Sequence, residues 1–164
     1  MKMTKISIIA LFACTLMLPG CKTATEVASN VASVSFELQC MGVELDGSQT
    51  IRAWGKGKGR ADAVEQAKKN AVRDVIFKGI TAGSGECNKK PLISEVNAQE
   101  KYEAYFNKFF ADGGKYAEFV NLKDEKDFSR LRAENDGTEN YGIIVRVLRA
   151  ELRQQLINDN ILKQ

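Results

Sequence analysis

Positively charged side chains and glycines alternate over residues 55–60. The segment reads Gly-Lys-Gly-Lys-Gly-Arg, so Lys56, Lys58 and Arg60 lie two residues apart. It follows a strand-like stretch and precedes a helix-like one, as phosphate-binding loops do. The spacing matches neither of the two common nucleotide-binding signatures, G-x-G-x-x-G and G-x-x-x-x-G-K followed by Ser or Thr. We interpret the segment as a flexible connection with solvated lysines. Binding of an anion or a negatively charged headgroup by Lys56, Lys58 and Arg60 is kept as an alternative.

Groups for other chemistry are scarce. The chain has no histidine, so the serines and cysteines lack the base that usually activates them. Asp124, Glu125 and Asp127 lie close together, but such a charged run is more often a solvated loop than a calcium site. A hydrolase built from two carboxylates that meet only in the fold stays open as an alternative. We predict no enzyme, no metal and no cofactor.

The first twenty residues decide where these groups act. Lys2 and Lys5 precede an uncharged run of 13 residues at 6–18. A mature membrane-spanning helix needs about 20 apolar residues, so the run is too short for one. Its layout is that of a secretory signal peptide. We expect residues 1–20 to be removed, residues 21–32 to form the modified N-terminus and a short tether, and residues 33–164 to form one domain.

The end of this run is Leu18-Pro19-Gly20-Cys21, which resembles the lipobox of bacterial lipoproteins. In that family the signal peptidase cuts before the cysteine, and the thiol carries a diacylglycerol. The resemblance implies lipidation at Cys21 and a membrane anchor in the cell envelope. Because Lys22 rather than an aspartate follows the cysteine, it favours the outer membrane. The alternative is a plain signal peptide or an uncleaved anchor.

Net charge argues against one class of partner. Removal of Lys2 and Lys5 leaves 22 basic against 21 acidic side chains, so the mature chain is nearly neutral. Proteins that bind nucleic acid usually carry a strong basic excess. We therefore expect no nucleic-acid partner.

Two cysteines remain in the predicted domain, Cys40 and Cys87, since Cys14 lies in the signal and Cys21 is assigned to the lipid. An even pair in an exported chain can close a disulfide, whereas a cytosolic pair stays reduced. A bridge over so long a loop typically contributes about 2–4 kcal/mol. We favour the disulfide. The alternative is that Cys40 is a small buried residue of a strand and Cys87 is free.

The hydrophobic pattern predicts an α+β fold. Strands cluster in hairpins rather than alternating with helices, which favours an antiparallel sheet with helices packed on one face over a doubly wound sheet. The order is β-β-α-α-β-β-β-α. The elements are strands at about 34–45 and 50–55, helices at 61–78 and 94–111, strands at 117–122, 127–133 and 141–148, and a helix at 149–158. The segment 116–122 could also form a short helix, and we favour the strand.

Aromatic residues concentrate between Tyr102 and Phe119. We expect them to pack in the core beneath the second helix, with exposure of some rings for partner binding as the alternative. Trp54 is expected either to anchor a surface contact or to belong to a second core layer.

The segment 53–72, AWGKGKGRADAVEQAKKNAV, resembles a recurring piece of small outer-membrane lipoproteins. These share a domain with the N-terminal module of the flagellar-ring protein FlgT. In that piece a strand ends in glycine, and a helix with regularly spaced alanines follows. The positions that match are Gly55, Gly57, Ala63, Ala67 and Ala71. The resemblance implies an α+β domain that binds partners in the envelope and has no catalytic residues. We expect a lipid-anchored structural or partner-binding module with an envelope protein as its partner.

Overall fold

The computed structural model describes residues 36–123, 131–135 and 138–163, which lie in the compact unit Ser33–Gln164. The predicted signal peptide, Cys21 and the tether lie outside the described residues. The acidic cluster of Asp124, Glu125 and Asp127 lies outside them as well.

The described strands form one mixed sheet of six strands. The order is β3-β1-β2-β6-β4. Strand β5 also pairs with β6, at residues 138–142, whereas β4 pairs with β6 at residues 145–147. The pairings among these strands are antiparallel except for β1 with β3. The bounds are β1 Gln39–Val43, β2 Gln49–Gly57, β3 Ala82–Gly83, β4 Val120–Leu122, β5 Leu131–Asn135 and β6 Thr138–Val147. The α+β class and the predominantly antiparallel sheet are confirmed.

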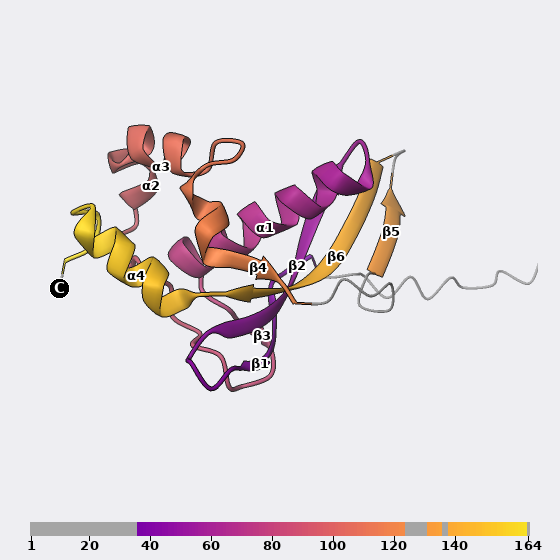
Figure 1. Cartoon of the computed structure of the whole chain (residues 1–164), viewed down its shortest axis with the longest axis horizontal. Coiled ribbons are helices and arrows are strands. Elements are labelled where there is room, and N and C mark those ends of the chain that lie inside the picture. Colours follow the sequence, from indigo (N-terminus) through magenta and orange to yellow (C-terminus); the bar gives the residue numbers. More distant parts are fainter. Residues whose placement is uncertain (1–35, 124–130, 136–137, 164) are drawn as a thin grey trace, which may run out of the picture. The chain divides into compact units, whose positions relative to one another are not determined.

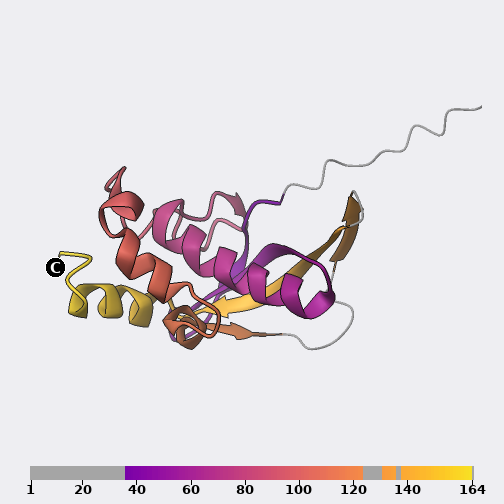
Figure 2. The same cartoon turned by 90° about the horizontal axis from the view of Figure 1, so that it is seen from above.

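The longest described helix packs on the centre of the sheet. It runs along β2 and β6, and the shorter helices gather near its C-terminal end (Figures 1 and 2). The predicted helices at 61–78 and 149–158 are confirmed within one residue at each end. The bounds are α1 Arg60–Phe77, α2 Ala98–Lys101, α3 Glu103–Phe109, a 3₁₀ helix η1 at Lys115–Phe119, and α4 Arg149–Asn158.

Small residues let α1 lie unusually close to β2. A Cβ atom on Gly55 would overlap the carbonyl oxygen of Ala63, and one on Gly57 would lie 2.5 Å from the Ala63 nitrogen. Ala63 and Ala67 are fully buried at this contact. The glycines therefore serve the packing of strand against helix, where any side chain would push the two backbones apart.

The sheet buries apolar side chains on both faces. Ile51 and Val145 are paired neighbours on the face that α1 covers, and both are fully buried. On the opposite face Trp54 is only 6% exposed and packs edge-to-face on Phe36, with ring centroids 5.4 Å apart. Its neighbour Gly142 leaves room for the indole, because a Cβ there would lie 3.0 Å from the ring. Of the two predictions for Trp54, the structure supports the second core layer.

The aromatic segment is core, as predicted, but its helix differs from the prediction. Instead of one helix over 94–111, α2 starts at Ala98, and Tyr102 separates it from α3 with φ −113° and ψ 30°. The buried rings of this region are Phe106, Phe109, Tyr116 and Phe119.

The predicted strand at 117–122 is correct only from Val120 onward. Residues 115–119 form η1 instead. In a 3₁₀ helix the side chains at i and i+3 lie on the same side. Tyr116 and Phe119 are spaced in this way, and both are buried. The 3₁₀ turn therefore places two aromatic rings in the core where a strand would place them on opposite faces of the sheet.

Candidate functional site

Cys40 and Cys87 form a disulfide, with Cα atoms 5.8 Å apart, which confirms the predicted pairing. Both residues are buried. Beside the bridge, β3 pairs in parallel with the start of β1, and Ser84 donates a backbone hydrogen bond of 2.9 Å to the Cys40 carbonyl. The bridge thus fastens the loop after β3 to the edge of the sheet.

The connection between β2 and α1 is shorter than the sequence predicts for the cationic segment 55–60. Because β2 continues through Gly57 and α1 starts at Arg60, only residues 58 and 59 connect them. Lys56, Lys58 and Arg60 are all exposed. Gly55 and Gly57 are explained by packing on α1, so they do not by themselves indicate a phosphate-binding loop. Anion binding by the three cationic side chains stays a prediction.

Carboxylates surround a hollow that Lys56 of this segment lines. Lys56 borders it together with Asp62, Glu65 and Asp112. On its far side Lys69 forms an ion pair of 2.5 Å with Asp112, which lowers the pKa of that carboxyl. The hollow therefore has mixed charge, and its acidic members oppose the binding of an anion beside Lys56.

A hydrogen-bond network joins α1 to η1 at this end. The hydroxyl of Tyr116 donates to Glu65, which also forms an ion pair of 3.2 Å with Lys68. The hydrogen bond from Tyr116 is the main cause of a lowered pKa at Glu65. Burial, together with the same hydrogen bond, raises the pKa of the Tyr116 hydroxyl. The network fixes η1 to the N-terminal half of α1.

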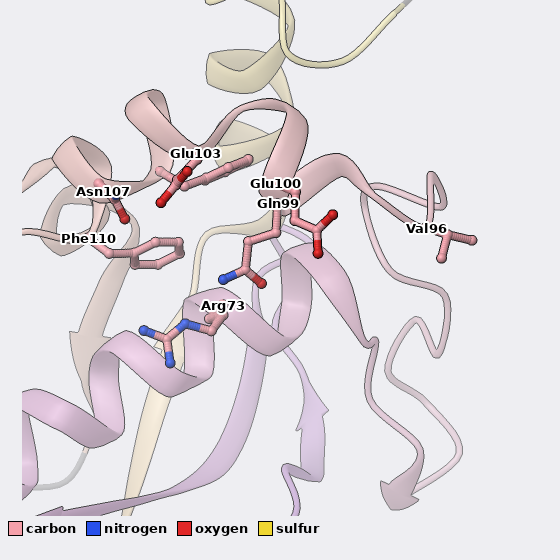
Figure 3. Close-up of a pocket in the computed structure, with 8 residues that line it drawn as sticks. Arg73, Val96, Gln99, Glu100, Glu103, Asn107 and Phe110 are labelled. Atoms are coloured by element: carbon pink, nitrogen blue, oxygen red, sulfur yellow. The ribbon is translucent and has the colours of Figure 1, made fainter.

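A groove lies between the last turns of α1 and the helices α2 and α3 (Figure 3). We call it the α1–α3 groove. Its volume is about 710 Å³. The lining residues are Arg73, Val96, Gln99, Glu100, Glu103, Phe106, Asn107 and Phe110.

The two walls of the α1–α3 groove carry opposite charges. Arg73 extends from α1 toward the gap, and Glu103 and Phe110 face it from the other wall (Figure 3). The guanidinium carbon of Arg73 lies 5.3 Å from the centroid of the Phe110 ring, and Nη1 donates a hydrogen bond of 3.4 Å to Asn70 Oδ1. Within the described residues, Arg73, Glu100 and Glu103 form no ion pair.

Sequence reasoning did not find the α1–α3 groove. The sequence pattern predicts Phe110 as part of the aromatic core, and it singles out none of Arg73, Glu100 and Glu103. No local pattern marks them, because the site exists only where two helices that are distant in sequence stand apart.

Neither a metal-binding cluster nor a membrane-spanning helix is present among the described residues. Among residues 36–123, 131–135 and 138–163, no three His, Cys, Asp or Glu side chains gather in a way that could hold a metal ion. None of the helices in the same ranges has the length and apolar character that crossing a membrane requires.

Comparison with known proteins identifies no relative of this chain. No family model, no curated protein and no solved structure matches the chain. The resemblances to bacterial lipoproteins and to the FlgT-related domain therefore stay predictions from the residues that carry them.

Proposed function

We propose that this chain is a lipid-anchored protein of the bacterial cell envelope, held at the outer membrane, whose α+β domain binds a protein partner and catalyses no reaction. The Cys40–Cys87 disulfide carries the proposal. Such bonds persist in oxidising compartments such as the periplasm and are rare in the cytosol. The disulfide thus agrees with the export signal predicted at 1–20 and with lipidation at Cys21.

The proposed anchor explains how a domain of this size acts without catalysis. Each buried methylene of an acyl chain contributes about 0.8 kcal/mol to membrane binding, so several chains on Cys21 hold the protein permanently. The described domain begins at Phe36. The residues between the two positions reach at most about 50 Å when fully extended. A partner bound to the domain is therefore kept close to the bilayer.

The α1–α3 groove is the surface that best supports partner binding. It joins charged, amide and aromatic side chains in one concave site, as binding sites commonly do. Glu100 and Glu103 are exposed. A hydrolase of the carboxylate type needs one acid held neutral by apolar surroundings, and these two positions do not provide that. The groove is better suited to recognition than to hydrolysis.

Mass spectrometry of the full chain isolated from membranes tests the anchor. We expect the chain to start at Cys21 and to carry a diacylglycerol thioether and further acyl mass. Cys21→Ser should move the protein to the soluble fraction or leave residues 1–20 attached. Cys14→Ser removes a thiol from the predicted signal and should leave lipidation unchanged. An unmodified Cys21 in the wild-type chain contradicts the proposal.

Site-specific photo-crosslinking tests the binding part. A crosslinking amino acid at Asn107, on the wall of the groove, should form a discrete adduct with one envelope protein. The same amino acid at Gln154, exposed on α4, should form none. Equal adducts from both positions would show that crosslinking reflects crowding at the membrane and not recognition by the groove.

A further inference from the structure

We infer that the α1–α3 groove binds a peptide segment of the partner that carries both a carboxylate and a cationic side chain. This inference rests on the proposed function, since it takes the occupant to be a segment of the bound protein. It names the chemistry that the groove selects.

The first observation is that several charges of the described residues are paired across elements. Lys69 of α1 binds Asp112 beyond α3, Lys123 after β4 binds Glu44 beside β1, and Arg146 of β6 binds Asp46 in the turn before β2. Each of these pairs joins two elements that are distant in the sequence.

The α1–α3 groove breaks this pattern. It holds one arginine on the α1 wall and two glutamates on the other wall, and no ion pair joins them. The hydrogen bond from Arg73 to Asn70 is long at 3.4 Å, and its other contact is the ring of Phe110. An occupant that presents a carboxylate to Arg73 and a cation to Glu100 and Glu103 supplies both missing partners.

The geometry of the side chains fits this pair of charges. A guanidinium forms two parallel hydrogen bonds with a carboxylate, which adds direction to the attraction. Glu100 at the end of α2 and Glu103 at the start of α3 both line the groove. Both accept hydrogen bonds from an ammonium or guanidinium group. The two charges of the occupant are thereby held in a fixed order across the groove.

The remaining lining residues suit a polypeptide backbone. Gln99 and Asn107 each offer an amide that donates and accepts hydrogen bonds, as peptide groups require. Phe110 contributes an aromatic face, and Val96 is 96% exposed at the rim. A volume of about 710 Å³ accommodates several residues rather than a single amino acid. The combination points to a short segment of protein.

Binding of fluorescein-labelled hexapeptides to the detergent-solubilised full chain tests the inference. The probes are alanine peptides with one aspartate and one lysine placed one to four residues apart. Matched probes replace the aspartate by asparagine or the lysine by glutamine. We expect at least one spacing of the doubly charged probe to bind about tenfold more tightly than either of its neutralised versions, which is the loss of one charge-assisted contact.

Groove variants assign each charge of the probe to a wall. Arg73→Gln should abolish the preference for aspartate and keep that for lysine. Glu100→Gln with Glu103→Gln should do the reverse. Arg153→Gln and Glu151→Gln, on exposed positions of α4, should leave both preferences unchanged. Because Arg73 also stacks on Phe110, Arg73→Lys retains the charge and should recover part of the preference for aspartate in a folded protein.

Three results would overturn the inference: no probe binds, all probes bind equally, or the groove variants bind like the wild type. None of these results affects the mass of the anchored chain or the crosslink from Asn107. Failure of the peptide test with a lipidated, crosslinking protein therefore rejects this ligand class alone. An unmodified Cys21 rejects the proposed function whatever the peptides do.

Discussion

The two halves of α1 are packed in opposite ways. Its N-terminal half lies against Gly55 and Gly57 of β2 through the small side chains of Ala63 and Ala67, so backbone approaches backbone. Its C-terminal half lies beneath aromatic rings, where Phe77 meets Phe106 with ring centroids 4.8 Å apart.

This difference in packing explains where along α1 a binding groove can form. Close packing of small residues leaves no space between β2 and the first half of α1. The hollow that this half borders beside Lys56 lies at the surface and has mixed charge. Bulky rings hold α3 away from α1, and the space left at the rim is the α1–α3 groove. Four predictions test this comparison.

The largest effect is expected from the aromatic half. Phe106→Ala should lower the free energy of unfolding by about 3–5 kcal/mol, because Phe106 is buried among rings that cannot close the cavity completely. Urea unfolding followed by circular dichroism measures the change. Phe36→Ala is the control, since Phe36 is 48% exposed, and it should cost about 1 kcal/mol. Equal losses at both positions would mean that the ring cluster is not a core.

The close packing of β2 on α1 should be destabilised by one added methyl group. Gly55→Ala should cost about 3 kcal/mol, at the upper end of the range for overpacking, because its Cβ meets backbone atoms of α1 that have no rotamer to change. Gly59→Ala is the matched control. No atom lies within 4 Å of a Cβ there, and the loss should stay below about 1 kcal/mol. A fully stable Gly55→Ala protein would show that α1 shifts freely over β2.

The network that joins α1 to η1 should contribute less. Tyr116→Phe removes the hydroxyl that donates to Glu65 and should cost about 1–2 kcal/mol, since Glu65 keeps Lys68 as a partner. Thermal unfolding gives the change. The double variant Tyr116→Phe/Glu65→Gln should be less destabilised than the sum of the two single variants. Strict additivity would indicate that the two side chains do not interact.

The smallest effect is a dependence on pH. The pKa of Glu65 is lowered in the folded protein, mainly by the hydrogen bond from Tyr116. Its stabilising contribution is therefore complete above the ordinary pKa of 4.5 and is lost as the pH falls through the lowered value. Glu65→Gln should unfold with a weaker dependence on pH below that point than the wild type. Glu151→Gln, exposed on α4, should keep the wild-type profile.

Periodic elements were predictable from the sequence. The alternation around Ile51, the alanine spacing of α1 and the β-branched run of β6 each follow from burial of one face. These three elements are the centre of the fold. The sequence also indicated the disulfide, because only two cysteines remained in the predicted domain.

Elements without a period were not predictable. The two residues of β3 show no alternation, and they pair only because Gly83 lets its backbone approach Cys40. The break at Tyr102 lies in a segment that has no glycine or proline, so no local signal marks it. The groove depends on this break and on the distance between two helices, which single-sequence patterns do not contain.

The bond between Cys40 and Cys87 has a mechanical consequence. It spans a sequence separation of 47 residues, which includes β2 and α1. A force that pulls the two ends of the chain apart would pass through the disulfide. The segment between Cys40 and Cys87 would bear no tension. The loop would release about 160 Å of contour length only after reduction, at roughly 3.4 Å per residue. In the proposed anchored form, a force from the bilayer would thus leave the helix that forms one wall of the groove inside a closed covalent ring.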